Sequence, residues 1–262
     1  MKLEILNQLE TAWAGKNCLC FPALESTNDY AKELAKKESV HGTLIVADTQ
    51  TAGKGRRGRV WQSPKGTTIS MSLCMEPKLR VENVAGLTLV MALAVAAGIK
   101  DVTGADPVIK WPNDIVLNGK KICGILTELC MKPDGYAVII GTGINVNAED
   151  FPEEIKEIAS SLKIETGKEI SREKLIASVL KYFETFYEKY EQTEDLSHLK
   201  EQYESMLANK DKEVNVLDPQ APYTGIAKGI NEAGNLIVIS EDGTEHCVYS
   251  GEVSVRGLYG YV

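Results

Sequence analysis

The chain has 262 residues, a formal net charge of −8 and a hydrophobic content of 44%. This length fits one large domain, or a large domain and a small one, and the hydrophobic content is ordinary for a packed globular protein. Nucleic-acid affinity comes mostly from many summed phosphate contacts, so a net negative chain is a poor general nucleic-acid binder.

The cysteines, the histidines and the N-terminus narrow the class of protein further. The 6 cysteines include no Cys-x-x-Cys pair and the 3 histidines stand alone, so zinc-ligand spacing is absent. The start of the chain lacks the pattern of a signal peptide. The longest apolar stretch, residues 84–99, is short for a membrane span and favours a buried helix. We therefore expect a reduced cytoplasmic setting and no membrane contact.

The N-terminal residues predict a short helix, a strand and a second helix. A helical pattern in residues 1–20 leads into a strand at residues 19–21, which leaves too few residues for a helix-turn-helix unit, so we expect no DNA binding. Ser26 is a good N-cap for the following helix, with Asp29 as a variant capping box. Capping alone explains Ser26 and Thr27, but a helix N-terminus with free hydroxyls also suits a polar ligand.

A basic, glycine-rich stretch after the apolar strand at residues 43–47 is the most distinctive part of the chain. Its glycines let backbone N–H groups approach a ligand, and its arginines offer planar forks for phosphate or carboxylate. We predict a mobile loop that closes over a phosphate-bearing small molecule, although such clusters also occur on solvated surfaces and nucleic-acid patches. It is not a Walker A loop, because Gly-Lys is followed by glycine and arginine. The stretch comprises Gly53, Lys54, Gly55, Arg56, Arg57, Gly58 and Arg59.

A polar interruption in residues 108–117 indicates a second part of a site. An apolar strand meets Pro112, which interrupts ladder pairing, and another strand follows. Lys110, Asn113 and Asp114 bring a cation, an amide and a carboxylate together at this break.

Further strands are predicted in residues 67–75, 120–129 and 136–140, with Asn118-Gly119 as a hairpin turn. The last strand runs into Gly141-Thr142-Gly143. A lone Gly-x-Gly lacks the third glycine of a dinucleotide fingerprint, so these glycines better suit close approach to a neighbouring element or a ligand.

The second half of the chain changes from helices to short strands. Residues 151–209 are predicted to be helical, with a core stripe in the helix that Ser171 caps, and residues 209–212 form a polar break. Regular short strands after it are typical of a small barrel. We predict domains at residues 1–210 and 211–262. The short strands are residues 214–217, 223–230, 236–239, 246–249 and 253–256.

Six segments, taken together, resemble the biotin–protein ligase family over nearly the whole chain. Each is modest alone, but their common order and spacing are specific. The resemblance implies an α+β fold in which helices flank a mixed β-sheet, as in class II aminoacyl-tRNA synthetases, with a C-terminal SH3-like β-barrel. The segments are residues 25–28, 50–61, 110–114, 121–128, 141–146 and 251–256.

The resemblance also assigns site residues. Those expected at biotin are Ser26, Thr27, Asn28, Gln50, Gly53, Lys54, Gly55, Lys121 and Gly124. Those expected at ATP and its phosphates are Arg56, Arg57, Arg59, Trp61, Lys110, Asn113, Asn145 and Arg256. The expected catalytic residues are Lys121, Arg56 and Asp114, of which Asp114 would also hold Mg²⁺. Candidates for stacking on adenine are Trp61, Trp111 and the loop near Phe151.

The implied activity is that of an ATP-dependent biotin–[acetyl-CoA-carboxylase] ligase. The biotin carboxylate attacks the α-phosphate of ATP, which forms biotinyl-5′-AMP and pyrophosphate, and a lysine of a biotin carboxyl carrier protein then takes the biotin. Fixed cations and Mg²⁺ would stabilise the charged transition state, so no side-chain nucleophile is needed. The family often forms homodimers, which makes a homodimer a further expectation.

Two residues depart from the family pattern. Lys54 stands where arginine is common, so a point charge replaces a planar fork, and Tyr203 stands where tryptophan is common. The DNA-binding domain of many relatives is not found in this sequence, so repressor activity is not expected.

Three alternatives stay open at this point. A lipoate–protein ligase shares the fold and the adenylation chemistry, but the basic loop and residues 251–256 favour biotin. A non-catalytic biotin-sensing module is opposed by an intact Lys121 and Asp114. A nucleic-acid-binding barrel is disfavoured, because the C-terminal strands lack a basic face with interleaved aromatic residues.

Overall fold

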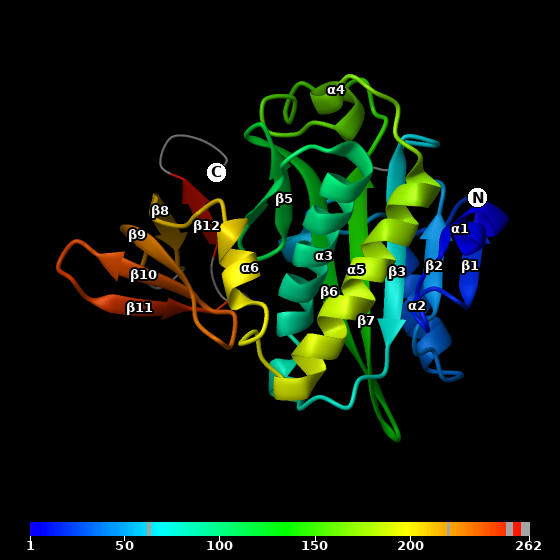
Figure 1. The fold of residues 1–262 in the computed structure, drawn as a ribbon, viewed down its shortest axis with the longest axis horizontal. Helices are drawn as coiled ribbons and strands as arrows, with labels where there is room; N and C mark the ends of the chain where they lie inside the picture. Colours follow the sequence, from blue (N-terminus) through cyan, green and yellow to red (C-terminus); the bar gives the residue numbers. More distant parts are fainter. Residues whose placement is uncertain (62–63, 219–220, 250–253, 258–262) are drawn as a thin grey trace.

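The structure, a computed structural model, describes residues 1–61, 64–218, 221–249 and 254–257, the last range by its backbone. Its centre is a seven-stranded mixed sheet with the order β1-β2-β3-β7-β6-β5-β4 (Figure 1). Only the β1–β2 pair of this sheet is parallel. Its strands are β1 (Cys18–Phe21), β2 (Leu44–Ala47), β3 (Thr68–Met75), β4 (Val108–Lys110), β5 (Asp114–Leu117), β6 (Lys120–Lys132) and β7 (Gly135–Asn145).

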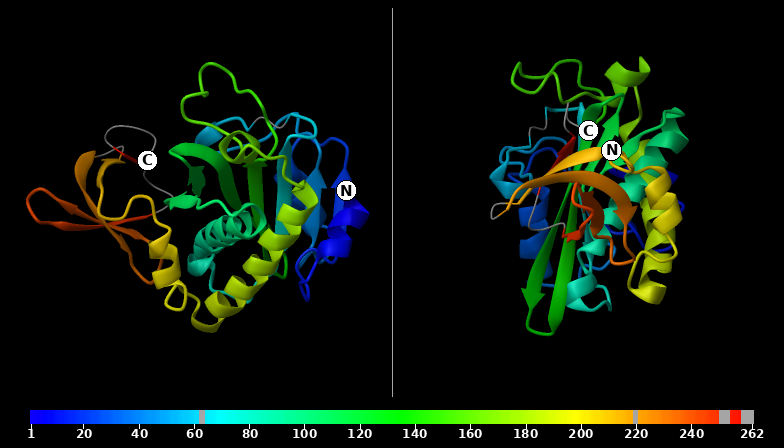
Figure 2. Two further views of the ribbon diagram at one scale, coloured as in Figure 1. Left: turned by 45° about the horizontal axis from the view of Figure 1, so that its top comes forward. Right: turned by 90° about the vertical axis from the view of Figure 1, so that its left-hand side faces the viewer.

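Helices cover both faces of this sheet, which confirms the predicted α+β class with a mixed sheet. In the right-hand view of Figure 2, α3 and α5 lie on one side of the strands and α2 lies on the other. Two short 3₁₀ turns, Arg56–Gly58 and Val81–Asn83, precede α3. The α-helices are α1 (Lys2–Gln8), α2 (Thr27–Ala35), α3 (Gly86–Thr103), α4 (Leu162–Thr166), α5 (Arg172–Thr193) and α6 (Lys200–Ser205).

Helix α3 is the buried helix predicted from the apolar stretch, and it ends at Gly104 in the left-handed conformation (φ 74°). It packs closely on α5, because a Cβ atom at Gly98 would lie only 2.9 Å from Val179 Cγ2. The stretch Val81–Thr103 is long and apolar enough to cross a membrane, and 72% of its most apolar window is buried inside the structure. A core helix passes the same test.

Alternation along β3 makes the two faces of the sheet different. Ile69 and Leu73 belong to the larger apolar core beneath α3 and α5, whereas Ser70 and Ser72 point the other way. On the neighbouring strand β7, Gly143 is paired with Ser70, and Gly141 with Ser72. The face under α2 therefore carries small residues at its centre, which leaves room for a cavity.

The prediction that residues 151–209 are helical is confirmed only in part. Only α4, α5 and α6 are α-helical there, and residues 153–158 form turns. Gly167 ends α4 in the left-handed conformation (φ 70°), and Glu194 does the same for α5 (φ 56°). These left-handed residues break the helical hydrogen-bond pattern, so the apolar periodicity of α5 does not extend through the region.

The C-terminal strands form a separate antiparallel sheet with the order β11-β10-β9-β8-β12. It lies beside α6 at one end of the large sheet (Figure 1). The predicted run of five short strands is therefore confirmed, while closure into an SH3-like barrel and the domain boundary at residue 210 stay predictions. The strands are β8 (Glu213–Leu217), β9 (Tyr223–Ile230), β10 (Leu236–Ser240), β11 (Glu245–Val248) and β12 (Ser254–Gly257).

Trp111 joins the C-terminal sheet to the large one. Its indole is buried, its Nε1 donates to the Gly234 carbonyl at 2.9 Å, and its backbone N–H donates to Asn209 Oδ1 at 3.0 Å. This burial removes Trp111 from the candidates for stacking on adenine.

Candidate functional site

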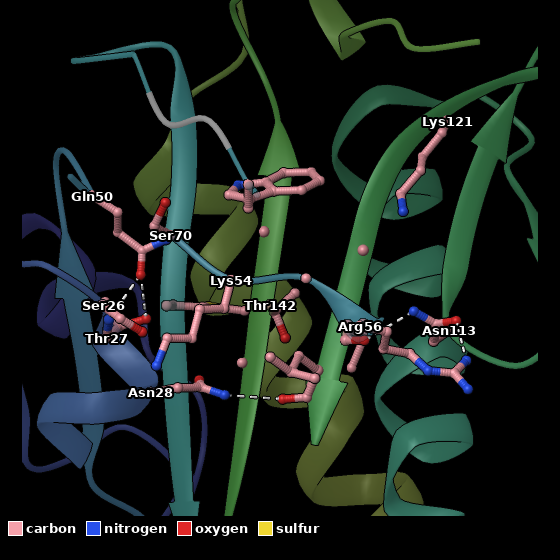
Figure 3. A pocket seen from close by; sticks show the side chains of 18 residues that line it. Ser26, Thr27, Asn28, Gln50, Lys54, Arg56, Ser70, Asn113, Lys121 and Thr142 are labelled. Atoms are coloured by element: carbon pink, nitrogen blue, oxygen red, sulfur yellow. Dashed lines mark hydrogen bonds between the residues drawn. The ribbon is translucent and has the colours of Figure 1, made fainter. Parts of the chain in front are cut away.

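A cavity opens on the α2 face of the large sheet, between the start of α2 and the basic loop (Figure 3). Strands β3, β6 and β7 form its floor. The residues that line it are Ser26, Thr27, Asn28, Gln50, Lys54, Gly55, Arg56, Trp61, Ser70, Met71, Asn113, Lys121, Gly124, Ile125, Leu126, Gly141, Thr142 and Gly143. Most of the residues predicted for biotin are thus brought together.

One end of the cavity is rich in hydroxyl and amide groups. Ser26 caps α2, where its Oγ accepts from the Asp29 N–H at 3.4 Å. Gln50 Oε1 accepts from the backbone N–H of Thr27 at 2.8 Å and lies 3.1 Å from Thr27 Oγ1. The expected helix cap is therefore real, and it also fixes the polar end of the cavity.

Backbone pairing holds the segment before α2 against the start of the basic loop. The Thr51 N–H donates to the Leu24 carbonyl at 3.0 Å, and the Ala52 N–H donates to the Glu25 carbonyl at 2.9 Å. A parallel bridge between Leu24 and Gln50 continues the β1–β2 pairing past the ends of both strands. The positions of Ser26, Thr27 and Gln50 relative to one another follow from this pairing.

Glycines on β6 and β7 let the indole of Trp61 lie against the sheet. A Cβ atom at Gly143 would meet Trp61 Cε2 at 2.4 Å, and one at Gly124 would meet Trp61 Cζ3 at 3.5 Å. The prediction that Gly141 and Gly143 permit close approach is confirmed, since a Cβ at Gly141 would lie 2.3 Å from Asn28 Oδ1.

Two polar atoms at the cavity are buried without a partner in the described parts of the chain. They are Trp61 Nε1 and Thr142 Oγ1. Burying a polar group costs free energy unless it is hydrogen-bonded, so both atoms suit a polar ligand in the cavity.

The basic loop folds back on itself over the cavity. The Gly55 N–H donates to the Arg59 carbonyl at 2.7 Å, and the Trp61 N–H donates to the Gly53 carbonyl at 2.9 Å. Of its glycines only Gly58 has a positive φ, 72°, while a Cβ at Gly53 would lie 2.4 Å from the Trp61 carbonyl oxygen. Close backbone approach rather than unusual φ therefore requires glycine at position 53.

Arg56 reaches from this loop to the break between β4 and β5. Its Nη1 donates to Asn113 Oδ1 at 2.8 Å, and Asn113 Nδ2 in turn donates to the Ile125 carbonyl at 3.0 Å. Burial lowers the pKa of the Arg56 guanidinium, but the group still carries its positive charge at neutral pH. The basic loop and the polar interruption in residues 108–117, which were predicted separately, therefore meet where Arg56 contacts Asn113.

Lys54 turns away from the loop toward helix α2. Its Nζ lies 2.6 Å from Asp29 Oδ2, and Lys32 Nζ lies 3.1 Å from the other oxygen of Asp29. Burial acts to raise the pKa of Asp29, but the hydrogen bonds from both lysines hold it below its ordinary value. A lysine at position 54 thus has a single-point ion pair, which requires no planar fork.

Lys121 and Asp114 form an ion pair at the edge of the cavity. Lys121 Nζ lies 2.6 Å from Asp114 Oδ1, and it lies 6.0 Å from the centroid of the Trp61 ring. Lys121 is part of the cavity lining. Asp114 is not, and its ion pair with Lys121 connects it to the cavity. Within residues 1–61, 64–218 and 221–249, no group of three or more His, Cys, Asp and Glu residues is placed to hold a metal ion.

Six other predicted residues, Gly53, Arg57, Arg59, Lys110, Asp114 and Asn145, lie outside the lining of this cavity. Arg57 lines a neighbouring groove with Val81 and Leu129. Lys110 and Asn145 are buried, and Asn145 Nδ2 donates to the Ser160 carbonyl at 3.1 Å. Gly53, Arg59 and Asp114 are close in sequence to residues that line the cavity, but they are not part of the lining themselves. The side chain of Arg256 lies outside the described residues.

Several lining residues were not predicted as site residues. Ser70 and Met71 come from β3, Ile125 and Leu126 from β6, and Thr142 from β7. They are ordinary strand residues, and only the pairing of β3, β7 and β6 brings them together. The Gly-Thr-Gly run was the one local signal for this part of the site.

Comparisons with known proteins agree with this geometry. Residues 20–145 match the "Biotin/lipoate A/B protein ligase family", and residues 211–256 match the "Biotin protein ligase C terminal domain". The two matches define a ligase of the biotin and lipoate class.

Individual relatives narrow the class. The chain is 39% identical over 255 residues to the "Bifunctional ligase/repressor BirA" of Bacillus subtilis. The aligned region covers 96% of this chain and 78% of that protein. It is 30% identical over 220 residues to the "Biotin--[acetyl-CoA-carboxylase] ligase" of Paracoccus denitrificans, covering 82% and 90%. The structure of the biotin protein ligase from Aquifex aeolicus in complex with biotin and ATP has a TM-score of 0.82 and 34% identity, covering 92% and 99%. The chain belongs to the biotin protein ligase family, and the predicted ATP-dependent biotin ligation is confirmed at this level.

Proposed function

We propose that this cavity binds biotin and the phosphates of ATP, and that the residues around it form biotinyl-5′-AMP and pass the biotin to a lysine of a biotin carboxyl carrier protein. One observation carries the proposal. The cavity has hydroxyl and amide groups at one end and the cations Arg56 and Lys121 at the other, under one loop. That arrangement suits a molecule with a polar ring, an apolar chain and a carboxylate.

Thr27 and Gln50 are proposed to hold the ureido ring of biotin, which carries N–H donors and a carbonyl acceptor. Gln50 Oε1 already accepts from the Thr27 N–H, so the Nε2 of Gln50 is the group left to donate to a ligand. Lipoate carries a dithiolane ring with no such donors or acceptors. A polar pocket discriminates strongly against a ligand that leaves its groups unpaired, so the residues favour biotin over lipoate.

Lys121 and Arg56 are proposed to act on the reacting groups. The Lys121 ammonium would bind the biotin carboxylate and a phosphoryl oxygen, which holds the nucleophile and the α-phosphate together. The Arg56 guanidinium, fixed by Asn113, would place positive charge where the transition state gathers negative charge. Closure of residues 53–61 would exclude water from the mixed anhydride.

The donor set is compatible with Mg²⁺ that is held mainly by phosphates. Mg²⁺ usually keeps several waters and takes one or two protein carboxylates beside substrate phosphates. Asp114, ion-paired with Lys121, is the carboxylate that the cavity edge offers. Bound there, the ion would neutralise phosphate charge.

The first test is the half-reaction without a carrier protein. The purified chain is incubated with biotin, Mg²⁺ and α-labelled ATP, and retained biotinyl-5′-AMP is measured by mass spectrometry. We expect a retained adenylate with biotin and none with lipoate. Absence of an adenylate with either acid would contradict the proposal, and an adenylate with lipoate alone would favour the second ligase activity.

A further inference from the structure

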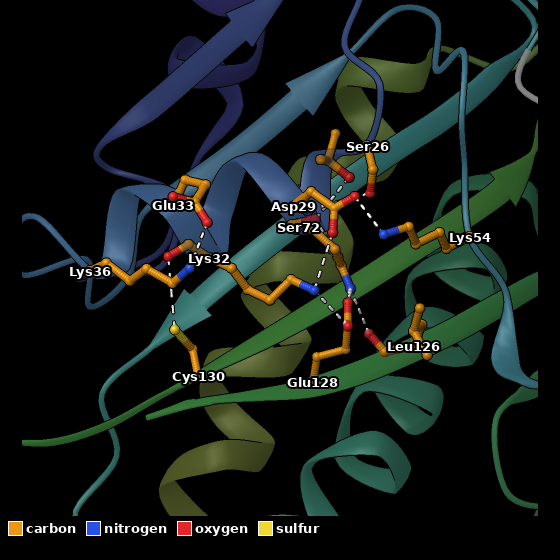
Figure 4. Close-up of polar contacts among 12 residues, drawn as sticks. Ser26, Asp29, Lys32, Glu33, Lys36, Lys54, Ser72, Leu126, Glu128 and Cys130 are labelled. Atoms are coloured by element: carbon orange, nitrogen blue, oxygen red, sulfur yellow. Dashed lines mark hydrogen bonds and ion pairs between the residues drawn. The ribbon is translucent and has the colours of Figure 1, made fainter. Parts of the chain in front are cut away.

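A chain of hydrogen bonds leads from the polar end of the cavity to Glu128, a residue that does not line it (Figure 4). Glu128 lies on β6, with its side chain 26% exposed. Its Oε1 accepts from Lys32 Nζ at 2.8 Å, and its Oε2 accepts from Asn28 Nδ2 at 2.7 Å. An ionised carboxylate is an acceptor only, so both contacts have a fixed direction.

These contacts fix the orientation of the Asn28 amide. Asn28 Nδ2 carries two protons, and it donates to Glu128 and to the Leu126 carbonyl, the latter at 3.2 Å. A reversed amide would place its oxygen against two acceptors. Asn28 Oδ1 is therefore held over Gly141, where it faces Ser72 Oγ at 2.6 Å.

Counting protons gives the directions of the next two bonds. Ser72 Oγ contacts both Asn28 Oδ1 and Thr27 Oγ1, the latter at 2.8 Å, but a serine hydroxyl has one proton. The amide oxygen of Asn28 can only accept, so the Ser72 proton goes to Asn28. Thr27 Oγ1 also lies 3.1 Å from Gln50 Oε1, but its contact with Ser72 is shorter, and Thr27 holds the only proton left for that contact. The Thr27 hydroxyl therefore donates to Ser72, and a lone pair of its oxygen is left to accept from a ligand.

We infer that Glu128 is a positioning residue which, through Asn28 and Ser72, makes the Thr27 hydroxyl a hydrogen-bond acceptor toward the ligand. An acceptor at this point suits an N–H group of a ureido ring. The inference rests on the proposed function and adds a residue that touches no ligand. Asn28 and Ser72, which are 4% and 0% exposed, are shielded from water that would otherwise reorient the bonds.

The test is a double-mutant cycle on biotin affinity, measured by calorimetry with the full chain. Thr27→Val removes the acceptor, and Glu128→Ala removes what orients it. We expect each to weaken biotin binding about 10-fold, and the double variant to bind within about 2-fold of Thr27→Val alone, because the two act through one bond. We expect the KM for ATP to change less than about 2-fold in Glu128→Ala.

Two further variants separate positioning from stability. Glu128→Gln keeps an acceptor for Asn28 without the charge, and it should bind biotin within about 3-fold of wild type. Glu76→Ala is the matched control, because Glu76 is also a partly exposed carboxylate (22%) paired with a lysine, Lys132, and does not line the cavity. It should leave biotin affinity unchanged, and thermal unfolding of each variant reports its folding.

The outcomes distinguish this inference from the proposed function. A wild-type chain that binds no biotin overturns both. A wild-type chain that binds biotin, with independent effects of Glu128→Ala and Thr27→Val, overturns the role of Glu128 alone. Glu128→Gln as weak as Glu128→Ala, or Glu76→Ala as weak as either, would also overturn it, since charge or general stability would then explain the loss.

Discussion

The two faces of the seven-stranded sheet share the same strands but have opposite composition. Toward α3 and α5, the strands present apolar residues such as Leu73 and Ile140, which belong to the same apolar core as the fully buried Phe183 of α5. Toward α2, Ser72 and Gly141 face a network of hydrogen bonds and a cavity. Because side chains alternate along a strand, one sheet can separate stability from ligand binding at neighbouring positions. Substitutions on the two faces should therefore change different measurements.

The largest effect is expected on the apolar face. Phe183→Ala removes a ring that is 0% exposed and packs beside Tyr187 with centroids 6.1 Å apart. We expect the free energy of unfolding to fall by about 3–5 kcal/mol, measured by denaturant titration. The KM for biotin of the remaining folded protein should stay within about 2-fold of wild type. A KM for biotin that rises well beyond 2-fold in the folded variant would show that the two faces are not separate in function.

Next in size is the loss of the cation at the cavity edge. Lys121→Ala should lower the rate of adenylate formation by about 10²–10³-fold, the range seen when one preorganised electrostatic group is removed. The measurement is pyrophosphate release at saturating biotin and ATP. The neighbouring Lys120, whose Nζ donates to the Lys156 carbonyl at 3.1 Å, gives the matched control Lys120→Ala with nearly normal rate. Equal losses in both variants would argue against a specific role for Lys121.

A smaller effect is expected when the loop loses its contact with the β4–β5 break. Arg56→Gly removes the bond to Asn113, so the loop should hold the adenylate less well. We expect about 10- to 150-fold faster release of biotinyl-5′-AMP, because the lost charged hydrogen bond is worth about 1.5–3 kcal/mol. The readout is labelling of lysines on a bystander protein such as albumin. Labelling no faster than wild type would contradict loop closure.

The smallest effect is expected for a buried hydroxyl in the larger apolar core, on the side of the sheet away from the cavity. Tyr203 is 0% exposed, and its Oη has no partner in the parts of the chain that the structure describes. Burial also raises the pKa of its phenol well above the ordinary value, so the group is neutral. Tyr203→Phe should leave the free energy of unfolding unchanged or raise it by up to about 1 kcal/mol. A loss above about 1 kcal/mol would mean that the hydroxyl has a hydrogen-bond partner in solution.

The sequence predicted best what local patterns encode. The N-cap at Ser26, the close approach at Gly141 and the basic loop each have a signal within a few residues, and all three lie at the cavity. The helix prediction for residues 151–209 was too extensive, because apolar periodicity in α5 says nothing about where the flanking turns begin.

Contacts between distant strands could not be predicted in the same way. Ser72 and Thr142 look like ordinary strand residues, and their positions depend on the register of β3, β7 and β6. The role of Trp111 was equally hidden, because its partner, Gly234, is 123 residues away.

That separation has a consequence for how the protein is made. The indole of Trp111 donates its N–H to Gly234, so its partner is synthesised long after it. At typical rates of chain growth, 123 residues take about 6–25 s. During that interval a large aromatic surface beside the nascent catalytic half lacks its native cover. A truncated chain that ends before residue 234 would leave the indole N–H without this partner, so correct burial of Trp111 depends on the C-terminal part of the chain being present.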